Sequence, residues 1–266
     1  MNIILITTLV IAVTGIIVGA GLVATGKKFA VEVDEREVAV RSQLPGNNCG
    51  ACGFAGCDAL AAAIAKGEAP VNACPVGGNP VAKEIGRVMG IDAAETERKV
   101  AFVACKGSCE VTKNQGNYIG IQDCRAAVMS GISVTDCSYG CLGFGSCAEV
   151  CPQQAIVVKN GVAIVNRNRC VSCGLCVKTC PRGLISLIPI SRVVQVQCSN
   201  HDRGPAVKKI CSAGCIGCSL CVKQCEAGAM TFANNLARVD SSKCTLCGKC
   251  AEKCPAKVIT AGTGPV

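Results

Sequence analysis

The most informative residues of this 266-residue chain are its 25 cysteines, most of which fall into tight runs. Three runs have the spacing C-x₂-C-x₂-C-x₃-C, which is typical of bacterial carriers of two [4Fe–4S] clusters. The short gaps let three thiolates surround one face of an iron–sulfur cube, and such cubes transfer electrons. The three runs are Cys170, Cys173, Cys176 and Cys180; Cys215, Cys218, Cys221 and Cys225; and Cys244, Cys247, Cys250 and Cys254.

The fourth cysteine of each run is expected to serve the neighbouring cluster, as it does in two-cluster ferredoxins. Zinc is a poor alternative, because four such runs in one chain are not typical of zinc sites. The predicted ligand groups are Cys215, Cys218 and Cys221 with Cys254; Cys244, Cys247 and Cys250 with Cys225; and Cys170, Cys173 and Cys176 with Cys151.

A fourth run is altered, because Phe144 occupies the position of its second cysteine. Cys137 lies just upstream and could replace the missing thiolate. The alternative is a site with three thiolates, such as a [3Fe–4S] cluster or one with a ligand other than cysteine. The predicted ligands are Cys137, Cys141, Cys147 and Cys180, with Cys151 completing the run.

The second half of the chain is an internal repeat. Nine cysteines from Cys124 to Cys180 each have a counterpart 74 positions later, without a gap. Short β-branched segments flank the runs and are expected to form strands. We therefore predict two ferredoxin-like α+β units, with strands at 155–159, 162–166, 184–188, 229–232 and 258–260.

An earlier group of cysteines has the spacing C-x₂-C-x₄-C-x₁₆-C. Three of its thiols lie on a glycine-rich loop, which can fold closely around a bulky group. The fourth follows a helical, alanine-rich stretch. Cys₄ zinc sites usually consist of two C-x₂-C knuckles, so one loop with a distant fourth thiol favours a [4Fe–4S] cluster. These ligands are Cys49, Cys52, Cys57 and Cys74.

Five cysteines remain after these twenty. Cys105, Cys109 and Cys124 could supply three ligands of a further cluster, closed by Cys198 or Cys211. The alternative is that all five are free thiols. We therefore expect five [4Fe–4S] clusters and consider a sixth, for which Cys105, Cys109, Cys124 and Cys198 are the first candidates.

The N-terminal segment is predicted to anchor the chain in a membrane. Ile3 to Ala24 contains 22 residues without a charge, about 33 Å as a helix, and this is enough to cross a bilayer core. Lys27 and Lys28 follow directly, so the positive-inside rule places the remainder in the cytoplasm. We expect a single pass through the inner membrane, with clusters on the cytoplasmic side, where thiols stay reduced.

The formal net charge of +9 does not indicate nucleic-acid binding. Each oxidised Cys₄ cluster carries about −2, so five clusters would nearly cancel it. The aromatic residues needed to stack bases are scarce. With one His and neither a Walker loop nor a G-x-G-x-x-G motif, we expect no catalytic residue and no nucleotide or flavin site of those types.

The predicted fold class is α+β, with a transmembrane helix, a small helical [4Fe–4S] domain and two tandem ferredoxin-like units. The expected boundaries are 1–26 for the anchor, 27–44 for a tether, 45–92 for the helical domain, 93–136 for a connecting segment, 137–190 for unit 1 and 198–262 for unit 2.

This order of segments resembles the B subunit of the Rnf complex, an ion-translocating ferredoxin–NAD oxidoreductase. The similarity covers nearly the whole chain and is most specific in LPGNNCGACGFAGCDALAAAIAKG, in Cys74-Pro75 and in CSYGCLGFGSCAEVCP, whose family pattern supports Cys137 as a ligand. The second unit, from about Cys198, resembles the longer versions of the family. The resemblance implies an electron-transfer subunit that exchanges electrons with soluble ferredoxin and passes them to membrane subunits, while another subunit reduces NAD⁺ and the complex moves Na⁺ or H⁺.

Two other functions are compatible with the runs alone. The chain could be a polyferredoxin of another membrane enzyme, such as a hydrogenase or dehydrogenase. It could also be a non-redox zinc or cluster-sensing module, although sensing needs one labile cluster and not several. Partner subunits would separate the first alternative from the Rnf interpretation, and visible absorption that bleaches on reduction would exclude the second.

Overall fold

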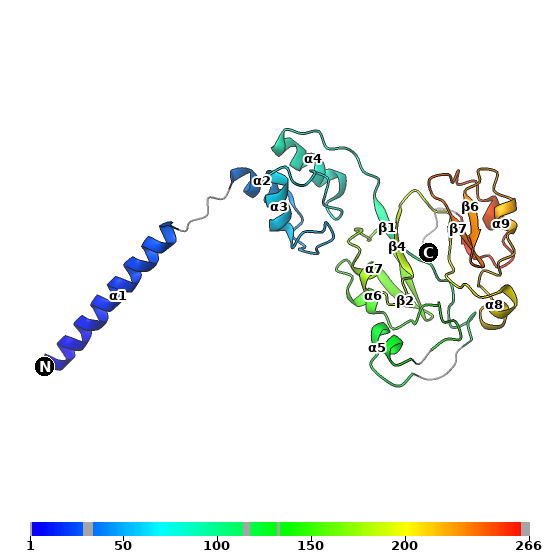
Figure 1. Cartoon of the computed structure of the whole chain (residues 1–266), viewed down its shortest axis with the longest axis horizontal. Helices are drawn as coiled ribbons and strands as arrows, with labels where there is room; N and C mark the ends of the chain where they lie inside the picture. The colour runs from blue at the N-terminus through cyan, green and yellow to red at the C-terminus, as the bar shows by residue number, and fades with distance from the viewer. Residues whose placement is uncertain (1, 29–33, 114–117, 132–133, 262–266) are drawn as a thin grey trace.

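The computed structural model describes residues 2–28, 34–113, 118–131 and 134–261 (Figure 1). Helix α1 (Asn2–Lys28) contains the span Leu5–Thr25, which has a mean hydropathy of 2.4 and is nowhere buried by protein. Within these ranges it is the one helix long and apolar enough to cross a membrane. An uncharged helix that the protein leaves uncovered fits a lipid environment, because its backbone hydrogen bonds are satisfied internally.

Three helices form the small domain that follows the anchor. They are α2 (Glu35–Gln43), α3 (Cys57–Ala65) and α4 (Gly78–Met89), and they enclose a core that includes Val40, Leu60 and Ile85. Because α2 packs against α3 and α4, the second half of the predicted tether belongs to this domain. Asp34 begins α2 by accepting a hydrogen bond from the amide of Arg36.

Unit 1 combines a short hairpin with a second pair of strands. Strands β2 and β3 form the hairpin, and β1 lies antiparallel to β4, with Val103 opposite Ile185. Strand β1 falls within the predicted connecting segment, so that segment contributes to unit 1. The elements are β1 (Lys99–Val103), α5 (Cys124–Met129), α6 (Ser146–Glu149), β2 (Ile156–Lys159), β3 (Val162–Val165), α7 (Leu175–Thr179) and β4 (Ile185–Pro189).

Unit 2 repeats this plan. Strands β6 and β7 form its hairpin, and β5 pairs with β8 as β1 pairs with β4. Its hairpin and its helices α9 and α10 lie 74 positions after their counterparts in unit 1. The elements are β5 (Gln195–Val196), α8 (Gly204–Ile210), α9 (Leu220–Lys223), β6 (Met230–Ala233), β7 (Leu236–Val239), α10 (Lys249–Glu252) and β8 (Ile259–Thr260).

The predicted α+β class with one apolar helix is therefore confirmed, and the five expected strands are present within one residue at each end. Strands β1, β5 and β7 were not predicted. Met1, residues 29–33 of the tether, residues 114–117 and 132–133 of the connecting segment and residue 262 of unit 2 lie outside the described residues.

Both units have cores of small aliphatic side chains and cysteines. The core of unit 1 contains Val100, Ile156 and Ile185 beside the buried thiols of Cys147 and Cys176. The core of unit 2 has the same composition around Cys215, Cys221 and Cys250. The chain has no Trp and only 5 Phe and 2 Tyr. Groups held by these thiols would therefore occupy space that large rings fill in other proteins.

The first prediction concerns the anchor. Deleting residues 2–28 should move the chain from the membrane fraction to the soluble fraction, because α1 carries the exposed apolar span. Fractionation followed by immunoblotting measures this. The matched control replaces Gly15 and Gly19 by leucine, which keeps the helix apolar and should leave the chain in the membrane. Membrane retention of the deleted chain after a high-salt wash would contradict the prediction.

Candidate iron–sulfur sites

Each cysteine run folds as a loop followed by a helix of about one turn. In all four runs, the residue before the helix has left-handed backbone angles: Gly145, Gly174, Ser219 and Gly248. Ser172 and Leu246, each directly before the second cysteine of its run, also adopt positive φ values of 63° and 61°. Such angles are unusual for residues with a Cβ and curl the loop tightly. The third cysteine of each run is buried at the second helical position.

One complete group of four thiols lies in unit 2. Cys215, Cys218 and Cys221 line a pocket with Cys254 of the following run, as predicted. Burial raises the pKa of Cys221 to about 11, and the nearby thiols of Cys215, Cys218 and Cys254 contribute in the same direction. The second predicted group of this unit consists of Cys225, Cys244, Cys247 and Cys250. Burial raises the pKa of Cys250, and the charges of Cys244 and Cys225 add to this effect. Cys247 is exposed at the surface.

The regular run of unit 1 forms a third group. Burial raises the pKa of Cys176 to about 12, followed by the charges of Cys170, Cys173 and Cys151. Backbone amides donate to two of these sulfurs, Ala101 to Cys170 at 3.4 Å and Ala155 to Cys151 at 3.2 Å. The predicted exchange of the fourth cysteine between runs therefore agrees with the arrangement of these thiols.

The helical domain contains the fourth predicted group, Cys49, Cys52, Cys57 and Cys74, of which the last three pack into one core. Burial is the main cause of the raised pKa of Cys173 in unit 1, and Cys49 lies close enough for its charge to contribute. Burial raises the pKa of Cys74, and the charges of Cys57 and Cys52 add to this effect. Gly77 donates its amide to the Cys74 sulfur at 3.4 Å. Asn48 begins α3 by accepting a hydrogen bond from the Cys57 amide at 2.8 Å, which fixes the third thiol of the loop.

The altered run differs from its sequence prediction. Cys141, Cys147 and Cys180 share one pocket with Cys124. Cys141 also lines the neighbouring pocket, which contains Cys137. Burial raises the pKa of Cys147 to about 12, and the charges of Cys141, Cys124 and Cys180 follow as causes. Cys124 is therefore the candidate for the ligand that is missing at Phe144, while Cys137 faces another pocket.

A hydrogen-bond network explains why Cys124 reaches this position. Asp123 caps α5 by accepting from the amides of Arg125 and Ala126, each at 2.9 Å. Ser146, within the altered run, donates to Asp123 at 2.7 Å and accepts from the Cys124 amide at 2.8 Å. The start of α5 is thereby joined to the start of α6. The ring of Phe144 packs beside Tyr118, with centroids 5.2 Å apart, and both rings lie against the core cluster that contains Cys124.

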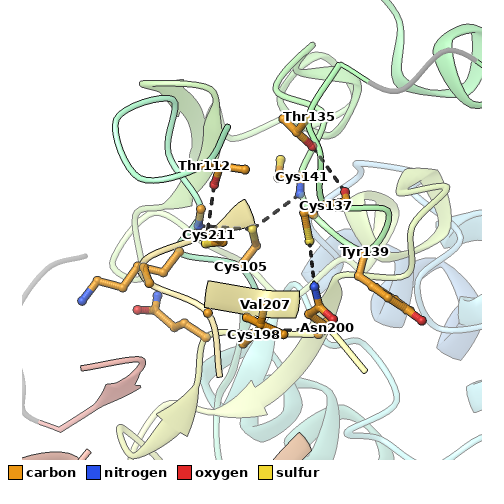
Figure 2. A pocket seen from close by; sticks show the side chains of 17 residues that line it. Cys105, Thr112, Thr135, Cys137, Tyr139, Cys141, Cys198, Asn200, Val207 and Cys211 are labelled. Carbon is orange, nitrogen blue, oxygen red and sulfur yellow. Dashed lines mark hydrogen bonds between the residues drawn. The ribbon is translucent and has the colours of Figure 1, made fainter. Parts of the chain in front are cut away.

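The five remaining cysteines do not form the predicted sixth group. Cys124 belongs to the altered run, and Cys109 is exposed beside Gly161. Cys105, Cys198 and Cys211 line a pocket with Cys137 between the two units, and Figure 2 shows their side chains around it. Sequence reasoning could not separate these thiols, because none of them belongs to a run of fixed spacing.

The donor arrangement fits clusters better than single metal ions. Across the described ranges, no three His, Cys, Asp or Glu side chains converge closely enough to hold one metal ion. Zinc binds sulfur at about 2.3 Å, so its four thiolates must nearly touch one another. A cube of iron and sulfide instead spreads its four ligands over separate corners. Its positive core would also offset the burial, and the smaller effect of neighbouring sulfur charges, that favour the protonated thiols here.

Replacing Cys124 tests the altered run. Cys124→Ser should reduce the iron of the anaerobically purified chain by about four atoms, because one cluster loses a ligand. Met129→Ser is the control, since Met129 is 87% exposed on the same helix and its replacement should leave the iron unchanged. Iron and acid-labile sulfide analysis measures both. An unchanged iron content in Cys124→Ser would restore Cys137 as the candidate ligand.

Three family models match separate segments of the chain. The model described as "Putative Fe-S cluster" matches residues 44–76, which contain the four thiols of the helical domain. Two models described as "4Fe-4S dicluster domain" match residues 135–185 and residues 214–258, within units 1 and 2. The chain therefore carries iron–sulfur clusters in all three regions.

Curated relatives match nearly the whole chain. The B subunit of the Na⁺-translocating ferredoxin:NAD⁺ oxidoreductase complex of Acetobacterium woodii is 45% identical over 92% of this chain and 74% of its own length. The B subunit of the ion-translocating oxidoreductase complex of Methanosarcina acetivorans is 43% identical over 94% of this chain and 95% of its own. Its counterpart in the proton-translocating complex of Clostridium ljungdahlii is 40% identical over 92% and 87%. The chain belongs to the family of Rnf B subunits, which are components of ion-translocating oxidoreductase complexes.

Proposed function

We propose that this chain relays electrons between soluble ferredoxin and the membrane subunits of an ion-translocating complex that exchanges electrons with NAD. The observation that carries the proposal is the succession of four-thiol groups from the helical domain next to the anchor to the far end of unit 2. The names of the relatives, all of them complex subunits, favour this role over that of an unrelated polyferredoxin.

We further propose five [4Fe–4S] clusters on the groups described above. When bound, such clusters accept and release one electron at a time. The chain itself supplies the thiolates, excludes water through its aliphatic cores and adjusts potentials through amides that donate to sulfur. The five ligand sets are Cys49, Cys52, Cys57, Cys74; Cys124, Cys141, Cys147, Cys180; Cys151, Cys170, Cys173, Cys176; Cys215, Cys218, Cys221, Cys254; and Cys225, Cys244, Cys247, Cys250.

The expected orientation is a single pass with all clusters in the cytoplasm. Lys27 and Lys28 directly follow the apolar span, and short positively charged flanks remain on the cytoplasmic side. This side also holds soluble ferredoxin and keeps the thiols reduced.

Unit 2 is the proposed docking surface for ferredoxin. Three of the 25 cysteines are exposed, and two of them, Cys218 and Cys247, are proposed ligands in this unit. The exposed side chains of Leu220 and Leu246 lie close to them in sequence. Residues 198–262 contain nine Lys or Arg and four Asp or Glu. A positive, partly apolar surface beside exposed ligands suits a transient contact with an acidic carrier.

Electron delivery to unit 2 provides the functional test. When reduced ferredoxin is mixed anaerobically with the full chain, the visible absorption of the chain should bleach. Lys223→Glu combined with Lys253→Glu should slow this roughly tenfold at low salt, because both side chains are exposed and steer an acidic partner. Stopped-flow absorbance measures the rate.

The control for this test is Lys66→Glu, an exposed charge reversal in the helical domain that should leave the rate unchanged. The difference between the variants should shrink as salt is raised, since screening weakens steering. A chain that does not bleach with ferredoxin but does bleach with dithionite would contradict ferredoxin as the partner and leave the relay intact.

The orientation can be tested through the exposed thiol of Cys109. A membrane-impermeant maleimide should label it in everted vesicles and not in intact spheroplasts, both kept anaerobic. Cys109→Ser provides the background. Labelling in intact spheroplasts would reverse the proposed sidedness.

A further inference from the structure

The pocket between the two units is lined by thiols from both of them. Cys105 and Cys137 come from unit 1 and its preceding segment, and Cys198 and Cys211 come from unit 2. Figure 2 shows the four side chains approaching the pocket from different segments of the chain. None of them belongs to the five ligand sets proposed above.

These four thiols follow the internal symmetry of the chain. Cys137 and Cys211 are 74 positions apart, as the repeat requires. Cys105 and Cys198 each lie two residues after the first strand of their unit, β1 or β5. Each unit thus contributes one thiol after its first strand and one thiol before its first cysteine run. The two equivalent pairs of thiols meet at the interface of the units and together provide four possible ligands.

Each of these four sulfurs accepts a hydrogen bond, and Cys141 of the altered run lines the same pocket. The Cys105 sulfur accepts from the amides of Gly107 at 3.4 Å and Cys141 at 3.5 Å. The Cys198 sulfur accepts from Asn200 at 3.5 Å and Cys215 at 3.3 Å, which is the same pattern in the second unit.

The other two sulfurs accept from side chains. Asn200 donates its Nδ2 to Cys137 at 3.4 Å, and Thr112 donates its hydroxyl to Cys211 at 3.6 Å. Burial disfavours thiolates in this pocket and raises the pKa of Cys105 to about 11. The donors aimed at the four sulfurs act against this effect by favouring the thiolate, which is the form that binds iron. Asn200 is almost completely buried at 2% exposure, and its side-chain amide is satisfied by donating to Cys137 and accepting from the Asp202 amide.

The pocket has the dimensions of the neighbouring cluster sites. It is similar in size to the pocket around Cys124, Cys141, Cys147 and Cys180 and to the pocket around the first group of unit 2. Lys106 lines it and adds a positive charge. All four cysteines are free thiols.

We propose that Cys105, Cys137, Cys198 and Cys211 hold a sixth iron–sulfur cluster, of the [4Fe–4S] type, at the junction of the two units. This inference rests on the proposed relay. It replaces the sequence-based set in two positions, since Cys124 serves the altered run and Cys109 remains the one unligated cysteine.

The sixth cluster would join the two units into one electron path. On one side, the amide that donates to Cys105 belongs to Cys141, a ligand of the altered run. On the other side, the amide that donates to Cys198 belongs to Cys215, a ligand in unit 2. On either side, one hydrogen bond and one cysteine residue therefore connect this site to a neighbouring cluster site. Each step would oxidise one site and reduce the next by one electron, with no bond formed or broken.

Iron analysis of the anaerobically purified full chain tests the inference. The unchanged chain should contain about 24 iron and as much sulfide, which corresponds to six clusters. Cys105→Ser and Cys211→Ser should each lower the iron by about four atoms, although they come from different units. The double variant should lose no more than either single variant, because both thiols serve one cluster. Cys109→Ser is the matched control and should retain about 24.

Spectra of the reduced chain provide a second readout that a general loss of structure would not imitate. Electron paramagnetic resonance during a redox titration should lose the contribution of one cluster in both single variants and keep the other five. About 20 iron in the unchanged chain, with no further loss in the variants, would overturn the sixth cluster. So would losses that add in the double variant, or zinc in place of the missing iron.

These outcomes are distinguishable from failure of the proposed function. A chain with about 20 iron that still bleaches with reduced ferredoxin keeps the relay and loses only the junction cluster. A chain without iron and sulfide, purified without oxygen, loses both.

Discussion

The burial of many thiols close together is the constraint on which the structure depends. Burial and neighbouring sulfur charges raise the pKa of Cys147 and Cys176 to about 12, so the protein alone favours neutral thiols at these positions. Iron reverses this preference, because it binds the thiolate and supplies positive charge. The same thiols are members of cores that contain few aromatic rings. Cluster loading and stability of the fold are therefore linked, and the chain depends on metal where other proteins of its size depend on large side chains.

Duplication provided two equivalent units, and the differences between them determine which thiols serve which site. Unit 1 has a longer segment between its first strand and its first run than unit 2 has. This segment contains Cys124, the proposed substitute for the thiol that is missing at Phe144, and Cys137 then lines the pocket between the units. Unit 2 keeps Cys218 at the position of Phe144 and needs no such replacement. The substitution at Phe144 and the longer segment of unit 1 thus leave Cys137 and its counterpart Cys211 available for a site between the units.

The sequence was most informative where ligand spacing is local. For the three regular runs, fixed gaps and one helical turn predict groups in which Cys151, Cys225 and Cys254 lie beside the neighbouring run, and the structure brings these thiols close together. Cys124 could not be assigned, because its position depends on hydrogen bonds between Asp123 and Ser146, which lie far apart in the sequence. The repeat of 74 positions also pairs Cys124 with Cys198 in the sequence. In the structure, the counterpart of Cys198 is Cys105, because each lies two residues after the first strand of its unit. Strand β1 escaped prediction for a similar reason, since its partner β4 follows more than eighty residues later.

The distribution of charge indicates how the relay would be oriented. Residues 45–92 contain three Lys or Arg and four Asp or Glu, so the helical domain is slightly negative before any cluster is added. Unit 2 has five more basic than acidic residues, and two clusters of about −2 each leave it close to +1. An acidic carrier would therefore be repelled from the domain beside the membrane and accepted at the far unit. Electrons that enter at unit 2 must pass through unit 1 to reach the domain beside the membrane. The thiols at the junction therefore determine whether the clusters of the two units form one continuous electron path.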